Sequence, residues 1–140
     1  MVEIELKPDK QRPGWFNASE AEPGVGHFHW RVSSQSLAWR PPTDVYITDD
    51  AIMVRVEIAG MRDSEFTISL DNHILTIRGT RPDQHKQRAY HQMEIRFGDF
   101  RTDIELHWPI DTDKIDAEYR DGFLRVILPK AKPHTVEIKD

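Results

Sequence analysis

The chain has no cysteine among its 140 residues, which excludes disulfide bonds, cysteine-ligated zinc sites and thiol chemistry. No apolar run approaches the roughly 18–20 residues that a membrane-spanning helix needs. Residues 1–7 have neither the basic region nor the apolar region of a signal peptide. We therefore expect a cytoplasmic protein that requires no membrane.

The sequence also lacks the motifs of common catalytic sites. It contains no nucleophile elbow, no phosphate-binding glycine loop with Gly-Lys-Ser/Thr and no His-Glu-x-x-His helix. His27 and His29 could lie on one side of an extended segment, but no third ligand is apparent. Chance is the better interpretation of this pair. We expect a protein that is not an enzyme and that has no metal or cofactor.

Apolar residues are scarce and charged residues are abundant, at 38% and 31% of the chain. This composition predicts that part of the chain stays outside a packed core. The 24 acidic residues outnumber the 19 basic ones and give a net charge of −5, which argues against a nucleic-acid partner. The length suits one domain with short extensions.

From residue 39 onward, alternating apolar side chains predict short β-strands. Ile52, Val54, Val56 and Ile58 recur at every second position, as in a strand that is buried on one face. Turn-forming residues separate the segments, and strong helical periodicity is absent. This arrangement is typical of a β-sandwich. Similar alternation occurs in residues 66–70, 74–79 and 104–108.

Residues 117–130 predict a β-hairpin. Asp121 and Gly122 supply the positive φ angles that a two-residue turn needs. Leu124, Val126 and Leu128 then fall on one face of the second strand, and Pro129 ends it.

This hairpin resembles the signature A-x-x-x-D/N-G-x-L of the α-crystallin domain, the core of the small heat-shock proteins. Its matching residues are Ala117, Asp121, Gly122 and Leu124. Further family motifs follow in the expected order at residues 39–46, 56–61 and 75–79, and at Glu94, Gly98, Phe100 and Leu106. The chain is identified as similar to the bacterial, archaeal and plant-like branch.

The resemblance implies an all-β fold, an immunoglobulin-like sandwich of two antiparallel sheets. It places the α-crystallin domain at residues 39–130, a flexible aromatic-containing arm at 1–38 and a C-terminal tail at 131–140. Two positions depart from the family pattern. Thr102 stands where an arginine is usual, with Arg101 one position early, and His107 stands where a proline is usual.

A long polar connection, residues 80–97, interrupts the strand pattern. Connections of this length in a compact domain are commonly functional or disordered. A strand that reaches out of its domain satisfies its backbone groups by pairing with another chain's edge, whereas a surface loop is the alternative on composition alone. The resemblance implies a dimer formed by strand exchange through this loop, with Arg88, Tyr90, His91, Met93, Glu94 and Ile95 as the exchanged residues.

The arm carries Trp15, Phe16, Phe28 and Trp30 although it has no regular period. Disordered tails are normally poor in aromatic residues, so these rings have something to contact. They either pack on their own domain or bind a partner subunit or client. We assign them to client binding.

The tail ends in a pair of aliphatic residues, Val136 and Ile138, which project the same way from an extended chain. Burial of two such side chains contributes about 1.5–3 kcal/mol each, which suits reversible association. The resemblance implies an anchor that binds a groove at the sheet edge of a neighbouring subunit.

These features imply an ATP-independent holdase that binds partly unfolded clients and prevents their aggregation under stress. Its partners would be itself, as a homo-oligomer built from dimers, and unfolded proteins. A CS-type cochaperone adaptor shares the sandwich, but a monomer needs neither the long loop nor the Val-x-Ile tail. A carbohydrate-binding or enzymatic module would need a concave site with clustered carboxylates or a metal.

Overall fold

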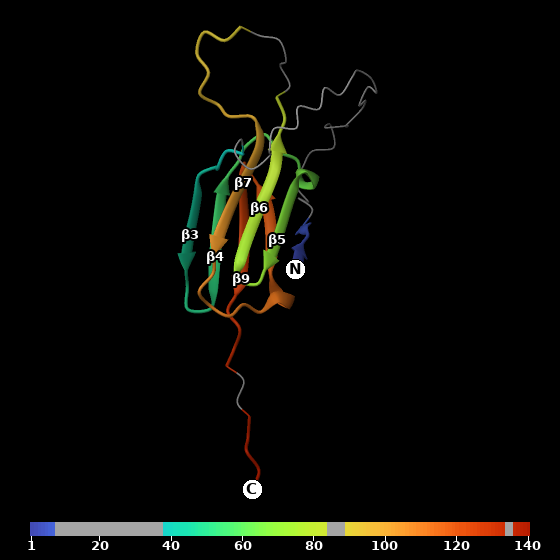
Figure 1. Ribbon diagram of the computed structural model, residues 1–140, viewed down its shortest axis with the longest axis vertical. Helices are drawn as coiled ribbons and strands as arrows, with labels where there is room; N and C mark the ends of the chain where they lie inside the picture. The colour runs from blue at the N-terminus through green and yellow to red at the C-terminus, as the bar shows by residue number, and fades with distance from the viewer. Residues whose placement is uncertain (8–37, 84–88, 134–135) are drawn as a thin grey trace.

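A computed structural model of the chain describes residues 1–7, 38–83, 89–133 and 136–140, which form two β-sheets packed face to face (Figure 1). The four-stranded sheet has the order β1-β5-β6-β7, with β1 at Val2–Ile4, β5 at Phe66–Asp71, β6 at Ile74–Arg81 and β7 at Gly98–Glu105. The five-stranded sheet has the order β2-β8-β9-β4-β3, with β2 at Leu6–Lys7, β8 at Asp116–Arg120, β9 at Phe123–Pro129, β4 at Ala51–Glu57 and β3 at Thr43–Ile47. The predicted all-β sandwich is confirmed.

Helical structure in the described ranges is limited to two 3₁₀ turns, η1 at Asp63–Glu65 and η2 at Thr112–Lys114. In these ranges, no helix has the length and apolar character needed to cross a membrane.

The core forms where the apolar faces of the two sheets meet. Ile52, Val54 and Val56 of β4 are buried, and their opposite neighbours on β9 are Leu128, Val126 and Leu124. Each strand alternates between the core and solvent because successive side chains point to opposite faces. The core also contains Ile58, Met61, Ile68, Leu70, Leu75, Ile77, Phe100, Ile104, Leu106, Ala117 and Tyr119.

The predicted hairpin is β8 and β9, joined by a tight turn. Asp121 and Gly122 have φ angles of 53° and 81°, as a two-residue primed turn requires. The carbonyl of Gly122 accepts a 2.9 Å hydrogen bond from the backbone N–H of Ile58. The signature turn is therefore tied to the end of β4 as well as joining its own two strands.

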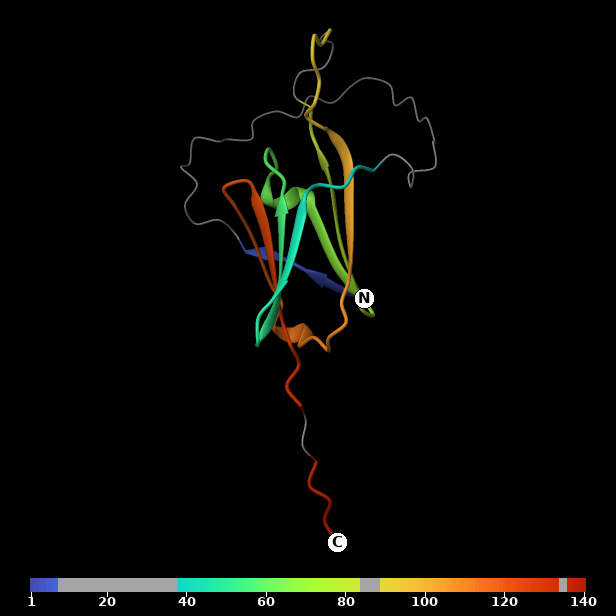
Figure 2. The same ribbon diagram turned by 90° about the vertical axis from the view of Figure 1, so that its left-hand side faces the viewer.

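The sequence assigned residues 1–38 to a flexible arm, and this is wrong for residues 2–7. β1 pairs antiparallel with β5 and β2 pairs parallel with β8, so the sheets are also not wholly antiparallel. Figure 2 shows this blue segment crossing from one sheet to the other. The physical reason is that Ile4 and Leu6 pack against the core. The backbone of β1 pairs with the edge of one sheet, and the backbone of β2 pairs with the edge of the other.

Gly79 of β6 generates a test of close packing within the four-stranded sheet. An added Cβ would lie 2.5 Å from the Glu65 carbonyl oxygen and 2.7 Å from Cζ of Phe100. Gly79→Ala should lower the free energy of unfolding by about 1–3 kcal/mol because the core must shift to make room. Urea denaturation measures this. The neighbouring exposed substitution Arg78→Ala should change stability by no more than about 0.5 kcal/mol, and an equal effect of both would contradict the packing argument.

Candidate interaction surfaces

The base of the long loop is held by Arg81, the last residue of β6. Its guanidinium donates two hydrogen bonds to the carbonyl of Arg96, the one from Nε being 2.7 Å long, and a 3.5 Å bond to the carbonyl of Ala59. The same group lies 4.6 Å from the ring centroid of Trp39 and 5.4 Å from that of Phe97. Arg81 thus joins the two stems of the loop to each other and to the start of the domain.

Partial burial lowers the pKa of Arg81 below its ordinary value, because removal from water disfavours the charged form. Arginine nevertheless stays protonated in proteins. A charged, planar donor close to two rings can satisfy several carbonyls at once, which an ammonium group cannot do with the same geometry.

The far part of the loop exposes apolar side chains. Met93 and Ile95 are 59% and 64% exposed, and Tyr90 is also exposed. Residues 89–97 form no strand within the single chain, and Figure 1 shows the yellow loop standing beyond the end of the sandwich. His91 and Glu94 are exposed beside them, whereas Arg88 lies outside the described residues.

A second exposed apolar surface lies on β3, at the edge of the five-stranded sheet. β3 pairs with β4 on one side. Val45 and Ile47 lie opposite the buried Val54 and Ile52, yet they are 44% and 46% exposed. They remain exposed because β3 lies to the side of the four-stranded sheet, which therefore does not cover it, as Figure 1 shows. Tyr46, on the other face of the strand, is exposed to the same degree.

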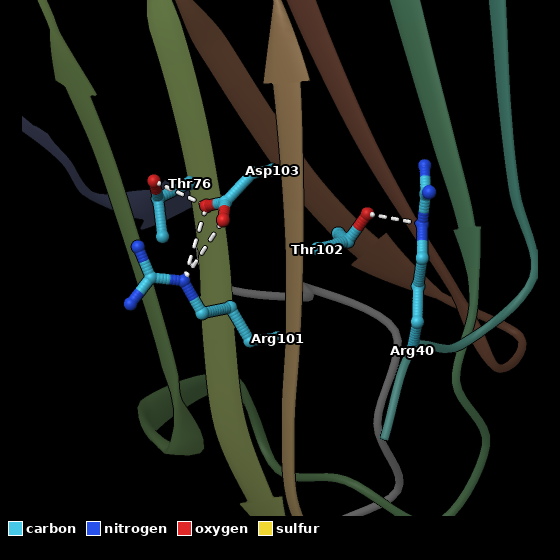
Figure 3. Close-up of polar contacts among 5 residues, drawn as sticks. All are labelled: Arg40, Thr76, Arg101, Thr102 and Asp103. Atoms are coloured by element: carbon cyan, nitrogen blue, oxygen red, sulfur yellow. Dashed lines mark hydrogen bonds and ion pairs between the residues drawn. The ribbon is translucent and has the colours of Figure 1, made fainter. Parts of the chain in front are cut away.

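β7 presents different polar groups on its two faces (Figure 3). Thr102 is buried, and its Oγ1 accepts a 3.2 Å hydrogen bond from Nε of Arg40. Arg101 lies on the opposite face, where its Nε donates to both carboxylate oxygens of Asp103 at 3.1 Å and Oγ1 of Thr76 donates to one of them at 2.8 Å. Arg101 therefore does not replace an arginine at position 102. The guanidinium beside Thr102 is instead that of Arg40, which lies in the segment before β3.

Other predicted residues are distributed as follows. Ala117 and Leu124 of the signature are buried in the core, and His107 is exposed after the buried Leu106. Val136 and Ile138 are 72% and 91% exposed, on a tail that extends away from the sandwich (Figures 1 and 2).

The arm residues Trp15, Phe16, Phe28 and Trp30 lie outside the described residues, as do His27 and His29.

Two functional features were not found from the sequence. Nothing in the pattern singles out Arg81, because an arginine at a strand end is ordinary and its partners are distant in the chain. The N-terminal strands did leave a signal, the alternation of Val2, Ile4 and Leu6, but a segment this short does not identify its partner strands.

The chain matches the Hsp20/alpha crystallin family over residues 44–139. It is 35% identical over 104 residues to the small heat shock protein C2 of Rickettsia felis, covering 71% of this chain and 68% of that protein. The chain belongs to the Hsp20/alpha crystallin family. It is also 34% identical over 100 residues to the 18 kDa antigen 2 of Mycobacterium avium, covering 69% of this chain and 72% of the antigen.

Solved structures of the family share the fold. Heat shock protein 16.0 of Schizosaccharomyces pombe matches with a TM-score of 0.64 at 29% identity, covering 76% of this chain and 80% of that chain. The hspA protein of Xanthomonas axonopodis matches with a TM-score of 0.61 at 28% identity, covering 66% of this chain and 94% of that chain.

Family membership confirms the prediction of a small heat-shock protein with an α-crystallin domain and supports a chaperone role. Members of the family are generally chaperones without enzymatic activity. Neither the CS-type adaptor nor a carbohydrate-binding or enzymatic module is favoured.

Arg81→Gln tests the link at the base of the loop. The variant loses the cation–π contacts and the paired donors, so it should lower the free energy of unfolding by about 1–2 kcal/mol and speed proteolysis within the loop. Arg81→Lys should not restore either property because lysine lacks the planar fork. The control is Arg96→Ala, which keeps the carbonyl that Arg81 binds. Equal proteolysis of Arg81→Gln and Arg96→Ala would show that Arg81 does not hold the loop.

Proposed function

We propose that this protein is an ATP-independent holdase that covers the exposed apolar surface of partly unfolded proteins and keeps them from aggregating. The observation that carries this proposal is a complete sandwich core in a member of the small heat-shock protein family, surrounded by apolar side chains left in solvent. They lie on β3, on the loop and on the tail.

These exposed side chains suit association with other chains. They are not needed to complete the core, and grouped exposed apolar residues commonly mark interaction surfaces. Each buried aliphatic side chain contributes about 1.5–3 kcal/mol, so a few contacts give binding that forms and dissociates readily. Chaperone activity of this kind needs no chemical step and no nucleotide.

The loop and β3 have complementary requirements. β3 offers unpaired backbone groups along its outer side among the described residues. Residues 90–95 have exposed side chains and form no strand of their own. Pairing the loop of one subunit with β3 of another would satisfy both backbones and cover Val45, Ile47, Met93 and Ile95. This supports a dimer formed by strand exchange.

Deleting residues 88–95 should leave the sandwich folded but monomeric, because the core strands are untouched and the exchanged strand is lost. Size-exclusion chromatography with light scattering measures the mass, and circular dichroism checks the fold. An unchanged dimer mass after the deletion would rule out strand exchange.

The control for this deletion is the tail variant Val136→Ala with Ile138→Ala. It removes the proposed anchor and leaves the loop intact. Higher oligomers of this variant should dissociate to dimers rather than to monomers, with little change in melting temperature. The two variants therefore separate dimer formation from higher assembly.

The proposed holdase activity is tested on a heat-unfolded client without nucleotide. The wild-type protein should suppress light scattering by the aggregating client, and added Mg–ATP should change nothing. Replacing Trp15, Phe16, Phe28 and Trp30 with Ser should weaken this suppression, because large aromatic surfaces supply much of the contact energy at interfaces.

The control for the arm is Trp108→Ser, which removes a partly exposed aromatic residue from the domain instead. It should retain suppression at equal subunit concentration. Full protection by the arm variant would move client binding to the domain surface, and no protection by the wild-type protein would refute the holdase function itself.

A further inference from the structure

The two ends of the chain carry the same short pattern. Val2-Glu3-Ile4 recurs as Val136-Glu137-Ile138. A second register matches four residues by chemical type: 4–7 read Ile-Glu-Leu-Lys and 136–139 read Val-Glu-Ile-Lys. In both copies the aliphatic side chains are two positions apart, so they project to the same side of an extended chain.

The N-terminal copy is bound at one side of the sandwich. Its β1 pairs with β5 of one sheet and its β2 pairs with β8 of the other, so residues 2–7 bridge the two edges (Figure 2). Ile4 and Leu6 pack against the core from there. Nζ of Lys7 lies 2.7 Å from Oδ2 of Asp116 on β8.

The C-terminal copy is free. Val136 and Ile138 are exposed. The tail leaves the sandwich at the end opposite to the loop (Figure 1). The same chemical pattern is thus present twice in one chain, once in a bound state and once in an unbound state.

We propose that residues 2–7 are an intramolecular occupant of the site that residues 136–139 of a second copy bind, so that anchoring by the tail requires release of the N-terminal segment. The proposal rests on the tail acting as an anchor, as put forward above. In the four-residue register, Val136 and Ile138 take the places of Ile4 and Leu6, and Lys139 takes the place of Lys7 beside Asp116.

The bound segment is suited to release. β1 and β2 have three and two residues, and short strands at a chain end open more readily than the core. The ion pair between Lys7 and Asp116 is exposed on both sides, so it contributes little to holding the segment. A tail from another chain therefore competes with a weakly held occupant. The apparent affinity for the tail is the intrinsic affinity multiplied by the fraction of domains whose site is open.

A disulfide lock tests this competition without disturbing the core. Glu3 and Ser69 are directly opposite on β1 and β5, and opposed residues of an antiparallel pair lie within the Cα range of a disulfide. In Glu3→Cys/Ser69→Cys the two new thiols have no other cysteine to pair with in the chain. The lock is placed in the full chain with Val136→Ser and Ile138→Ser, so that the protein's own tails do not compete.

The probe is a fluorescent peptide of residues 130–140, followed by fluorescence anisotropy. The reduced protein should bind it, and the oxidised protein should bind it about tenfold more weakly or worse, because the site is then held closed. Ile4→Ser with Leu6→Ser, in the same tail background without the cysteines, should bind it more tightly than the unsubstituted N-terminus. A peptide with Ser at positions 136 and 138 should bind none of these proteins.

Non-reducing electrophoresis checks that the disulfide is intramolecular, and thermal melting checks that every variant is folded. Equal binding by the oxidised and reduced proteins would overturn the proposal, as would binding by neither. The assay contains no client, so failure here leaves the holdase proposal standing, and loss of client protection does not affect this result.

Discussion

The constraint on which this structure depends is that backbone groups at the edge of a β-sheet need partners. On one side of the sandwich, residues 2–7 cover the edges of β5 and β8. On the other side, Trp39 exchanges backbone hydrogen bonds with Asp99 and Arg101 beside β7, while β3 keeps an open edge among the described residues. The differences between these edges set which surfaces remain for other chains.

The long loop and the C-terminal tail leave the sandwich at opposite ends (Figure 1). Trp39, where the domain begins, and Phe97, where the loop returns, both contact the guanidinium of Arg81, so the start of the domain and the base of the loop lie at one end. The tail leaves from the other end, after β9 (Figure 1). The base of the loop and the start of the tail are therefore separated by the length of the sandwich (Figure 1).

Most of the sandwich could be predicted from the sequence. The alternation at Ile52, Val54 and Val56 identifies a strand and its buried face without knowledge of its neighbours, because the period of two is a local property. The turn at Asp121 and Gly122 is equally local, since positive φ angles favour these residue types. The family motifs depend on the same short-range signals, and for this reason they identify the fold well.

The candidate surfaces required the folded chain. Whether Val45 and Ile47 are buried depends on where the facing sheet ends, and the role of Arg81 depends on carbonyls and rings contributed by three separate segments. The sequence by itself determined the strands β4, β5 and β6, the signature hairpin and the aliphatic pattern of the tail, because each follows from neighbouring residues, whereas the strand expected at residues 104–108 is β7 at Gly98–Glu105. Only the tertiary structure decided that residues 2–7 lie across two sheet edges, because pairing between distant strands is set by the whole packed core.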